Sequence, residues 1–93
     1  MPLIGYRYPT TPEENSLKPA NAFGQALRHF RASLKISQER LSQESGLDRS
    51  YISLLERGQR QPTLKSISSL ANALETTLTE VARQIECKLN ENR

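Results

Sequence analysis

The chain has 93 residues, of which 35% are hydrophobic and 25% are charged, so we expect one domain with one modest core. Thirteen Lys and Arg against ten Asp and Glu give a formal charge of +3, which permits nucleic-acid binding without requiring it. No apolar run reaches the roughly 18 residues of a membrane span, and a single cysteine excludes a disulfide within the chain. These features favour a cytoplasmic protein with no signal peptide and no membrane partner.

The first 20 residues contain four prolines and scatter their few apolar side chains without a period. We therefore expect residues 1–20 to form a flexible N-terminal arm, residues 21–89 to form the folded domain and residues 90–93 to form a C-terminal tail. The arm either has no specific role, as is common for chain ends, or contacts a protein partner.

Helical spacing begins at Asn21, which is suited to be the N-cap of a first helix. Apolar residues then recur every three or four positions, at Phe23, Ala26, Leu27, Phe30 and Leu34. A second, shorter helix is expected to start from Ser37 as its cap and to end before Gly46, because glycine accepts the positive φ that a tight turn requires.

Three further helices are expected, each with its own cap. Asp48 is the expected cap of a helix that runs to Arg57, Thr63 is the expected cap of the next, and Thr77 with Glu80 fits a capping box at the start of the last. The apolar face of the fourth helix is expected to contain Leu64, Ile67, Leu70, Ala71 and Leu74. Five short helices and no convincing strand predict an all-α fold, a compact five-helix bundle.

The helix expected over residues 48–57 has two unlike sides when successive residues are placed about 100° apart. One side carries Tyr51, Ile52 and Leu55 and can pack on the first two helices. The other side is polar and basic and carries Arg49, Ser50, Ser53 and Arg57, with Leu54 at the border. Such a helix is suited to present its early residues to an acidic surface.

Ser42, Gly46 and Ile52 have the spacing of a short, tight angle between the second and third helices. Ser42 is small enough for the third helix to cross close above it, Gly46 permits the turn, and Ile52 fills the angle. Together they predict a helix-turn-helix unit.

The chain resembles the phage-repressor and Cro-like helix-turn-helix regulators, the XRE family, over about residues 22–83. The resemblance is carried by the segments FGQALRHFR, SQERLSQESG and LDRSYISLLERGQRQPTLKSISSLANAL. Within it, LDRSYIS followed by ERGQR is also similar to the controller proteins of restriction-modification systems. The resemblance implies a lambda-repressor-like DNA-binding domain whose third helix lies in the major groove and whose second helix crosses the phosphate backbone.

The resemblance also implies base contacts. Arg49, Ser50 and Leu54 match family positions that meet base edges, and Ser53 shares their side of the helix. Arg49 can donate two hydrogen bonds to the O6 and N7 atoms of guanine, unless it grips a phosphate or pairs with Asp48 instead. Leu54 stands where the family often has a polar or basic residue, so it contacts a thymine methyl group or no base at all.

Phosphate contacts are expected from residues around the same helix. Gln38 matches a family position that holds a phosphate at the N-terminus of the second helix. Arg57, Arg60 and Lys65 flank the third helix and the loop after it, where a DNA backbone would pass. As surface residues without a role they would look the same in sequence.

Arg31 and Glu56 correspond to family positions that form an internal ion pair between the first and third helices. Truncating one member of a buried pair costs about 3–5 kcal/mol. Replacing Glu56 by alanine is therefore expected to unfold the domain more than it weakens DNA contact.

The expected fifth helix carries an apolar stripe that consists of Leu78, Val81, Ile85 and Leu89. The stripe can close the core, meet a second subunit, or do both. A short regulator gains affinity by pairing on half-sites about 34–36 Å apart, so we expect a homodimer whose interface contains these four residues.

An enzyme is not expected, because His29 is the only histidine and no cluster of His, Cys or carboxylates has catalytic or metal-binding spacing. We accordingly expect no catalytic residue, metal or cofactor. The sequence is interpreted as a regulator that binds double-stranded DNA sequence-specifically, as a homodimer on a palindromic operator. The alternative is an antitoxin-like module that uses the same fold to bind a protein partner.

Overall fold

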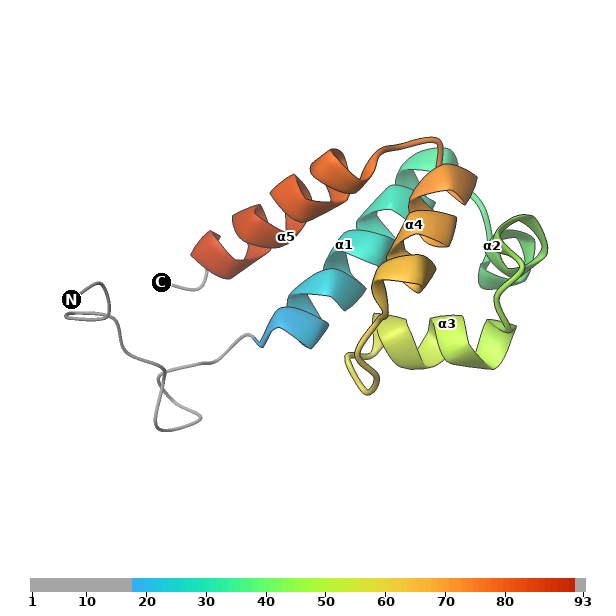
Figure 1. Ribbon diagram of the computed structural model, residues 1–93, viewed down its shortest axis with the longest axis horizontal. Coiled ribbons are helices and arrows are strands. Elements are labelled where there is room, and N and C mark those ends of the chain that lie inside the picture. The colour runs from blue at the N-terminus through green and yellow to red at the C-terminus, as the bar shows by residue number, and fades with distance from the viewer. Residues whose placement is uncertain (1–17, 92–93) are drawn as a thin grey trace, which may run out of the picture.

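The computed structural model describes residues 18–91, which form five α-helices and no strand (Figure 1). The helices are α1 (Pro19–Leu34), α2 (Gln38–Ser45), α3 (Arg49–Glu56), α4 (Leu64–Ala73) and α5 (Leu78–Glu91). The predicted all-α, five-helix architecture is confirmed. Most of the predicted N-terminal arm lies outside the described residues.

Four of the helices start from the cap residues that the sequence predicts. The side-chain oxygens of Ser37, Asp48 and Thr63 accept hydrogen bonds from backbone N–H groups in the first turns of α2, α3 and α4. Thr77 Oγ1 accepts in the same way from the backbone N–H of Glu80 at the start of α5. Each cap satisfies a donor that has no partner within its own helix.

The ends of the folded part differ from the prediction. Asn21 is not an N-cap, because α1 already begins at Pro19 and takes in two residues of the predicted arm. Proline has the φ of a helix and lacks an N–H that would stay unpaired in the first turn, so it starts α1 without a side-chain cap. At the other end, α5 continues through Glu91, past the predicted boundary at residue 89.

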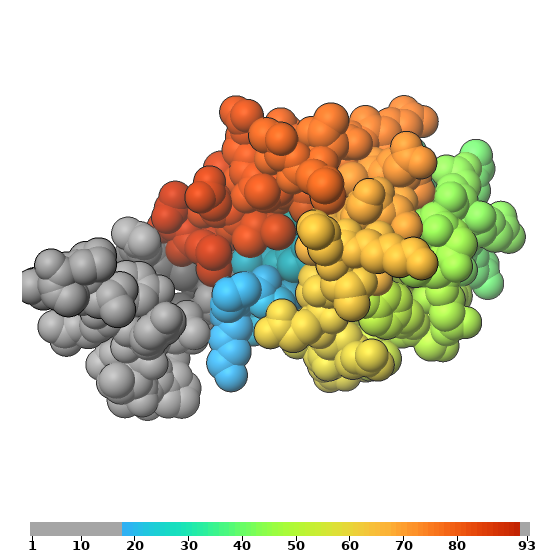
Figure 2. All heavy atoms as spheres, in the orientation of Figure 1, coloured from blue at the N-terminus to red at the C-terminus, as the bar shows by residue number. Residues whose placement is uncertain are grey.

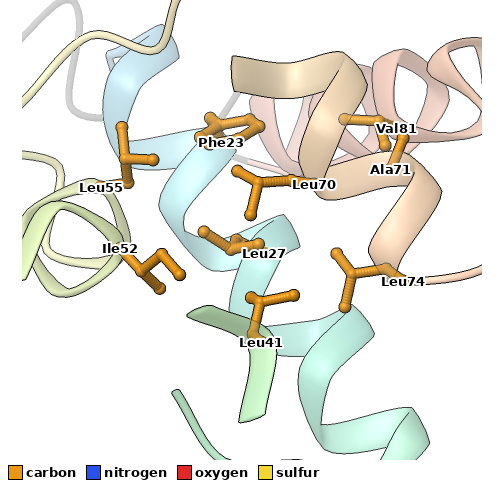
Figure 3. Close-up of a cluster of buried hydrophobic side chains, with 9 residues drawn as sticks. All are labelled: Phe23, Leu27, Leu41, Ile52, Leu55, Leu70, Ala71, Leu74 and Val81. Carbon is orange, nitrogen blue, oxygen red and sulfur yellow. The ribbon is translucent and has the colours of Figure 1, made fainter. Parts of the chain in front are cut away.

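The core lies where all five helices meet. α1 packs against α3 and α5, α2 packs against α3 and α4, and α4 packs against α5. A cluster of buried apolar side chains fills the core and consists of Phe23, Leu27, Leu41, Ile52, Leu55, Leu70, Ala71, Leu74 and Val81 (Figure 3). Leu64 was expected on the apolar face of α4 but is 73% exposed, whereas Ile67, one turn later on the same face, packs against the core.

Helices α1 and α3 approach each other closely at Gly24. A Cβ atom placed on Gly24 would lie 2.6 Å from the backbone carbonyl oxygens of Leu55 and Glu56. No larger residue therefore fits at Gly24 unless one of the two helices moves. This close approach fixes the C-terminal end of α3 against α1.

Candidate nucleic-acid interface

The turn between α2 and α3 has the geometry that the sequence predicts. Ser42 Oγ donates to the carbonyl oxygen of Leu47 at 2.5 Å. Gly46 has a left-handed φ of +79°, and its N–H donates to the carbonyl oxygen of Ser42 at 2.9 Å. Asp48 then caps α3 by accepting from the N–H of Ser50 at 2.9 Å. The helix-turn-helix unit formed by α2 and α3 lies at one edge of the molecule (Figure 1).

Helix α3 separates its apolar side chains from its polar ones as expected. Ile52 and Leu55 are 0% exposed and point into the core (Figure 3). The four residues predicted to contact bases reach the surface, fully at Arg49 and Ser50 and partly at Ser53 and Leu54. Within residues 18–91 the Arg49 guanidinium has no hydrogen bond or ion pair, so the alternative pairing with Asp48 is not present.

Three of the residues predicted to contact phosphate, Arg57, Arg60 and Lys65, are exposed on the loop after α3 and at the start of α4. This loop lies at the surface beside α3, on the lower side of the molecule (Figure 2, yellow). Arg57 Nε donates to the carbonyl oxygen of Ser53 at 3.4 Å. The Arg60 guanidinium lies over the ring of Tyr51, 5.5 Å from the ring centroid. Arg60 is thus held against α3.

Gln38, the fourth residue predicted to contact phosphate, makes a contact inside the protein. It is half-buried at the start of α2, and its Nε2 atom donates to Oε1 of Glu56 at 2.9 Å. One of its two amide hydrogens is therefore used, which leaves the other hydrogen and the unpaired N–H groups of the first turn of α2 for an anion. The phosphate contact of Gln38 stays a prediction.

Glu56 is buried at the end of α3 and forms an internal ion pair with Arg31 of α1. Arg31 donates from Nε to Oε2 of Glu56 at 2.7 Å and from Nη2 to Oε1 at 3.0 Å. Its Nη1 donates to the carbonyl oxygen of Ile36 at 3.0 Å. The hydrogen bond to Glu56 outweighs the effect of burial and raises the pKa of Arg31 above its ordinary value. Because Glu56 is neutralised internally, the exposed charges from Arg49 to Lys65 are all positive.

The apolar stripe of α5 is divided between two environments. Val81 is 4% exposed and belongs to the core of its own chain, and Ile85 packs partly against that core. Leu78 is 43% exposed, and Leu89 is half-buried. Val81 therefore closes the core of its own chain, which is one of the two roles expected for the stripe, and its side chain is already covered. The interface at Leu78, Ile85 and Leu89 stays a prediction.

A surface hollow next to Leu78 was not predicted. It has a volume of about 720 Å³, lies along α4 and the start of α5, and is lined mostly by small side chains. Leu64 and Leu78 both border it and are both exposed. Helical periodicity placed each leucine on an apolar face, so it could not reveal that the two share one exposed surface.

None of the helices in residues 18–91 is long and apolar enough to cross a membrane. In the same part of the chain, no group of three or more His, Cys, Asp and Glu residues is placed to hold a metal ion. His29 is exposed on α1. The features that stand out are the positively charged side chains around α3.

An all-α bundle with a helix-turn-helix unit, whose second helix turns basic and polar side chains outward, is the architecture of a helix-turn-helix regulator. A family model described as helix-turn-helix matches residues 27–81. The chain belongs to this family of transcriptional regulators, which is the XRE-type family that the sequence resembles.

Controller proteins of restriction-modification systems are among its relatives. C.AhdI from Aeromonas hydrophila is 47% identical, with a TM-score of 0.65 over 67% of this chain and 94% of that one. Control protein C.SmaI from Serratia marcescens is 40% identical over 55 residues, 59% of this chain and 66% of the relative. The C.Esp1396I controller tetramer, in complex with its natural 35 base-pair operator, is 26% identical, with a TM-score of 0.74 over 80% of this chain and 97% of that one. The chain spans less than two thirds of the length of the curated relatives that it matches.

Proposed function

We propose that the chain is a transcriptional regulator that binds double-stranded DNA sequence-specifically, with α3 in the major groove. The observation that carries this proposal is the positive surface around α3: Arg49 on the helix, Arg57 and Arg60 just after it and Lys65 at the start of α4 are exposed, and no exposed acid lies among them. An exposed helix face flanked by basic side chains suits the major groove, which is about 12 Å wide and lined by phosphates. The relatives named as controller proteins, one of them in complex with its operator, support the proposal.

Base contacts would come from the outward residues of α3. Arg49 is unpaired within residues 18–91 and long enough to donate two hydrogen bonds to one guanine. The hydroxyls of Ser50 and Ser53 can each donate or accept, and Leu54 can contact a thymine methyl group. Phosphate contacts, which orient the protein without reading sequence, would come from Gln38, Arg57, Arg60 and Lys65.

The functional unit that we propose is a homodimer on a palindromic operator. Leu64 and Leu78 are 73% and 43% exposed at the same hollow, and a second copy would remove both from water. Ile85 and Leu89 lie farther along the same stripe of α5 and would extend the interface, while Val81 stays in the core. Two copies would place their α3 helices on half-sites about 34–36 Å apart.

Selection of binding sites from random duplexes tests this function. The wild-type chain should select a palindrome with a preferred guanine in each half-site. Arg49→Ala should lose the preference at that position alone, because one bidentate contact supplies about 1–3 kcal/mol of discrimination. Arg28→Ala, which removes an exposed arginine from α1, is the matched control and should leave the preference unchanged. If Arg49→Ala selects the same sequence as the wild type, Arg49 does not read a base.

The alternative is an antitoxin-like module that uses the same fold to bind a protein partner, and the arm before Pro19, its suggested partner segment, lies outside the described residues. Within residues 18–91 the positive charge around α3 favours DNA, and the exposed leucines at the hollow are assigned to the proposed second copy. We propose a regulator without enzymatic activity that acts in the cytoplasm, in keeping with a family of transcriptional regulators.

A further inference from the structure

The loop between α3 and α4 carries Arg60, and one side chain of α3 holds this arginine in place. The guanidinium carbon of Arg60 lies 5.5 Å from the centroid of the Tyr51 ring. Arg60 is exposed, so without this contact its long side chain would move among many rotamers. A guanidinium that lies over an aromatic ring keeps the N–H groups at its edge free to donate to a phosphate.

The hydroxyl end of Tyr51 connects α3 to the first turn of α4. It lies 3.1 Å from Oγ of Ser66, and either hydroxyl can be the donor. Ser66 is 8% exposed, and its Oγ accepts from the Thr63 hydroxyl at 2.9 Å. Thr63 Oγ1 in turn accepts from the backbone N–H of Ser66 at 3.0 Å. These bonds fix the end of the loop at α4, while the Tyr51 ring holds Arg60 within the loop.

We propose that Tyr51 is a positioning residue for DNA binding, which sets the place of the Arg60 guanidinium relative to α3. The inference rests on the proposed function and deepens it. Tyr51 is half-buried and packs against the core, so its own ring has a defined orientation. Arg49 and Tyr51 belong to the same eight-residue helix, and Tyr51 therefore keeps the phosphate contact of Arg60 at a constant distance from the base contact of Arg49.

The test compares Tyr51→Phe, Tyr51→Leu, Arg60→Ala and the double variant Tyr51→Leu/Arg60→Ala. Binding is measured over a series of salt concentrations, on one duplex of fixed sequence and on a pool of random-sequence duplexes. Arg60→Ala removes one phosphate contact, so it should weaken binding about fivefold to the fixed duplex and to the random pool. It should also reduce the salt slope, the fall of log affinity with log salt concentration, by about 0.9. Tyr51→Leu should reproduce most of both effects although Arg60 is still present. Tyr51→Phe keeps the ring and should keep the wild-type slope.

The double variant shows whether Tyr51 acts on DNA binding through Arg60 or only through its packing in the core. In the Arg60→Ala background, Tyr51→Leu should weaken binding by less than about twofold, because the arginine that it positions is gone. Phe30→Leu is the matched control, since it replaces another partly buried ring that packs against the same core, on α1. It should leave the salt slope at the wild-type value.

Several outcomes would overturn the inference. If Tyr51→Leu weakens DNA binding as much in the Arg60→Ala background as in the wild type, Tyr51 acts only through packing. If Tyr51→Leu loses a different amount of affinity for the fixed duplex than for the random pool, Tyr51 contacts bases. A wild-type chain that binds neither duplex would overturn the proposed function, and this inference with it.

A measurement on the free protein decides the geometry even if Tyr51→Leu does not fold. The δ-methylene protons of Arg60 should show an upfield ring-current shift in the NMR spectrum of the wild type and of Tyr51→Phe. Absence of that shift in a wild-type chain that binds DNA would overturn the positioning role of Tyr51 and leave the proposed function intact.

Discussion

Removal of the Glu56 carboxylate should destabilise the fold far more than removal of a carboxylate from an exposed ion pair. The Glu56 side chain is 3% exposed, and it accepts two hydrogen bonds from Arg31 and one from Gln38. Breaking a buried pair by removing one member costs about 3–5 kcal/mol. Glu56→Ala leaves behind Arg31, which is 22% exposed and can still reach water, so we expect a loss near the lower end, about 3 kcal/mol.

Thermal and urea unfolding, followed by circular dichroism, measure this loss. Each kcal/mol lowers the Tm of a domain of this size by about 4–8 °C, so Glu56→Ala should lower the Tm by about 12–24 °C. Glu44→Ala is the matched control because it breaks the Arg40–Glu44 pair, whose side chains are 60% and 40% exposed. The control should lose about 0.5 kcal/mol or less. If Glu56→Ala loses no more free energy of unfolding than Glu44→Ala, the buried pair does not stabilise the fold as argued.

The pH dependence of this comparison follows from the pKa of Arg31. The hydrogen bond to Glu56 raises that pKa in the folded state, so the stabilisation is complete below the ordinary pKa of arginine and is lost only as the pH rises through the raised value. The titration of Arg31 therefore should not change the difference in free energy of unfolding between wild type and Glu56→Ala over about pH 6–9.

Two further predictions concern packing and association. Gly24→Ala should lower the free energy of unfolding by about 2–3 kcal/mol because the new Cβ lies 2.6 Å from two carbonyl oxygens. Gly46→Ala has open space but a φ of +79°, and should lose only about 1 kcal/mol; equal losses in urea unfolding would contradict the close approach of α1 and α3. Leu78→Glu should convert the proposed homodimer to a monomer in light scattering, whereas Leu34→Glu, at a leucine that is 37% exposed on α1, should not. A wild-type chain that stays monomeric at all concentrations, with and without DNA, would end the dimer proposal.

Local signals in the sequence predicted the starts of four of the five described helices, because a cap acts within one turn of the chain. Ser37, Asp48 and Thr63 each hold a backbone N–H of the next turn, and that geometry depends little on the rest of the fold. The start of α1 was misplaced because Pro19 and Asn21 are both helix-start signals and lie within one turn of each other. Only the backbone conformation decides between them.

Contacts between distant residues were harder to predict, because they depend on side-chain rotamers and on the path of the loops. The Tyr51–Arg60 contact and the bond from Gln38 to Glu56 have no periodicity that would reveal them. The pair formed by Arg31 and Glu56 is also distant in sequence, and it was expected only because the family resemblance supplied it. The division of the α5 stripe depends on where α4 ends and α5 returns across the bundle.

Different side chains of α3 anchor the helix in the core and face solvent, and this separation affects how the target site can change. Ile52 and Leu55 anchor the helix in the core, whereas Arg49 and Ser50 face solvent and take no part in that anchoring. Replacements at the two outward positions should therefore change stability by less than about 0.5 kcal/mol. If Arg49 and Ser50 read bases as proposed, a lineage carrying this scaffold can adopt a new target site through a few surface replacements, without first acquiring mutations that restore its stability.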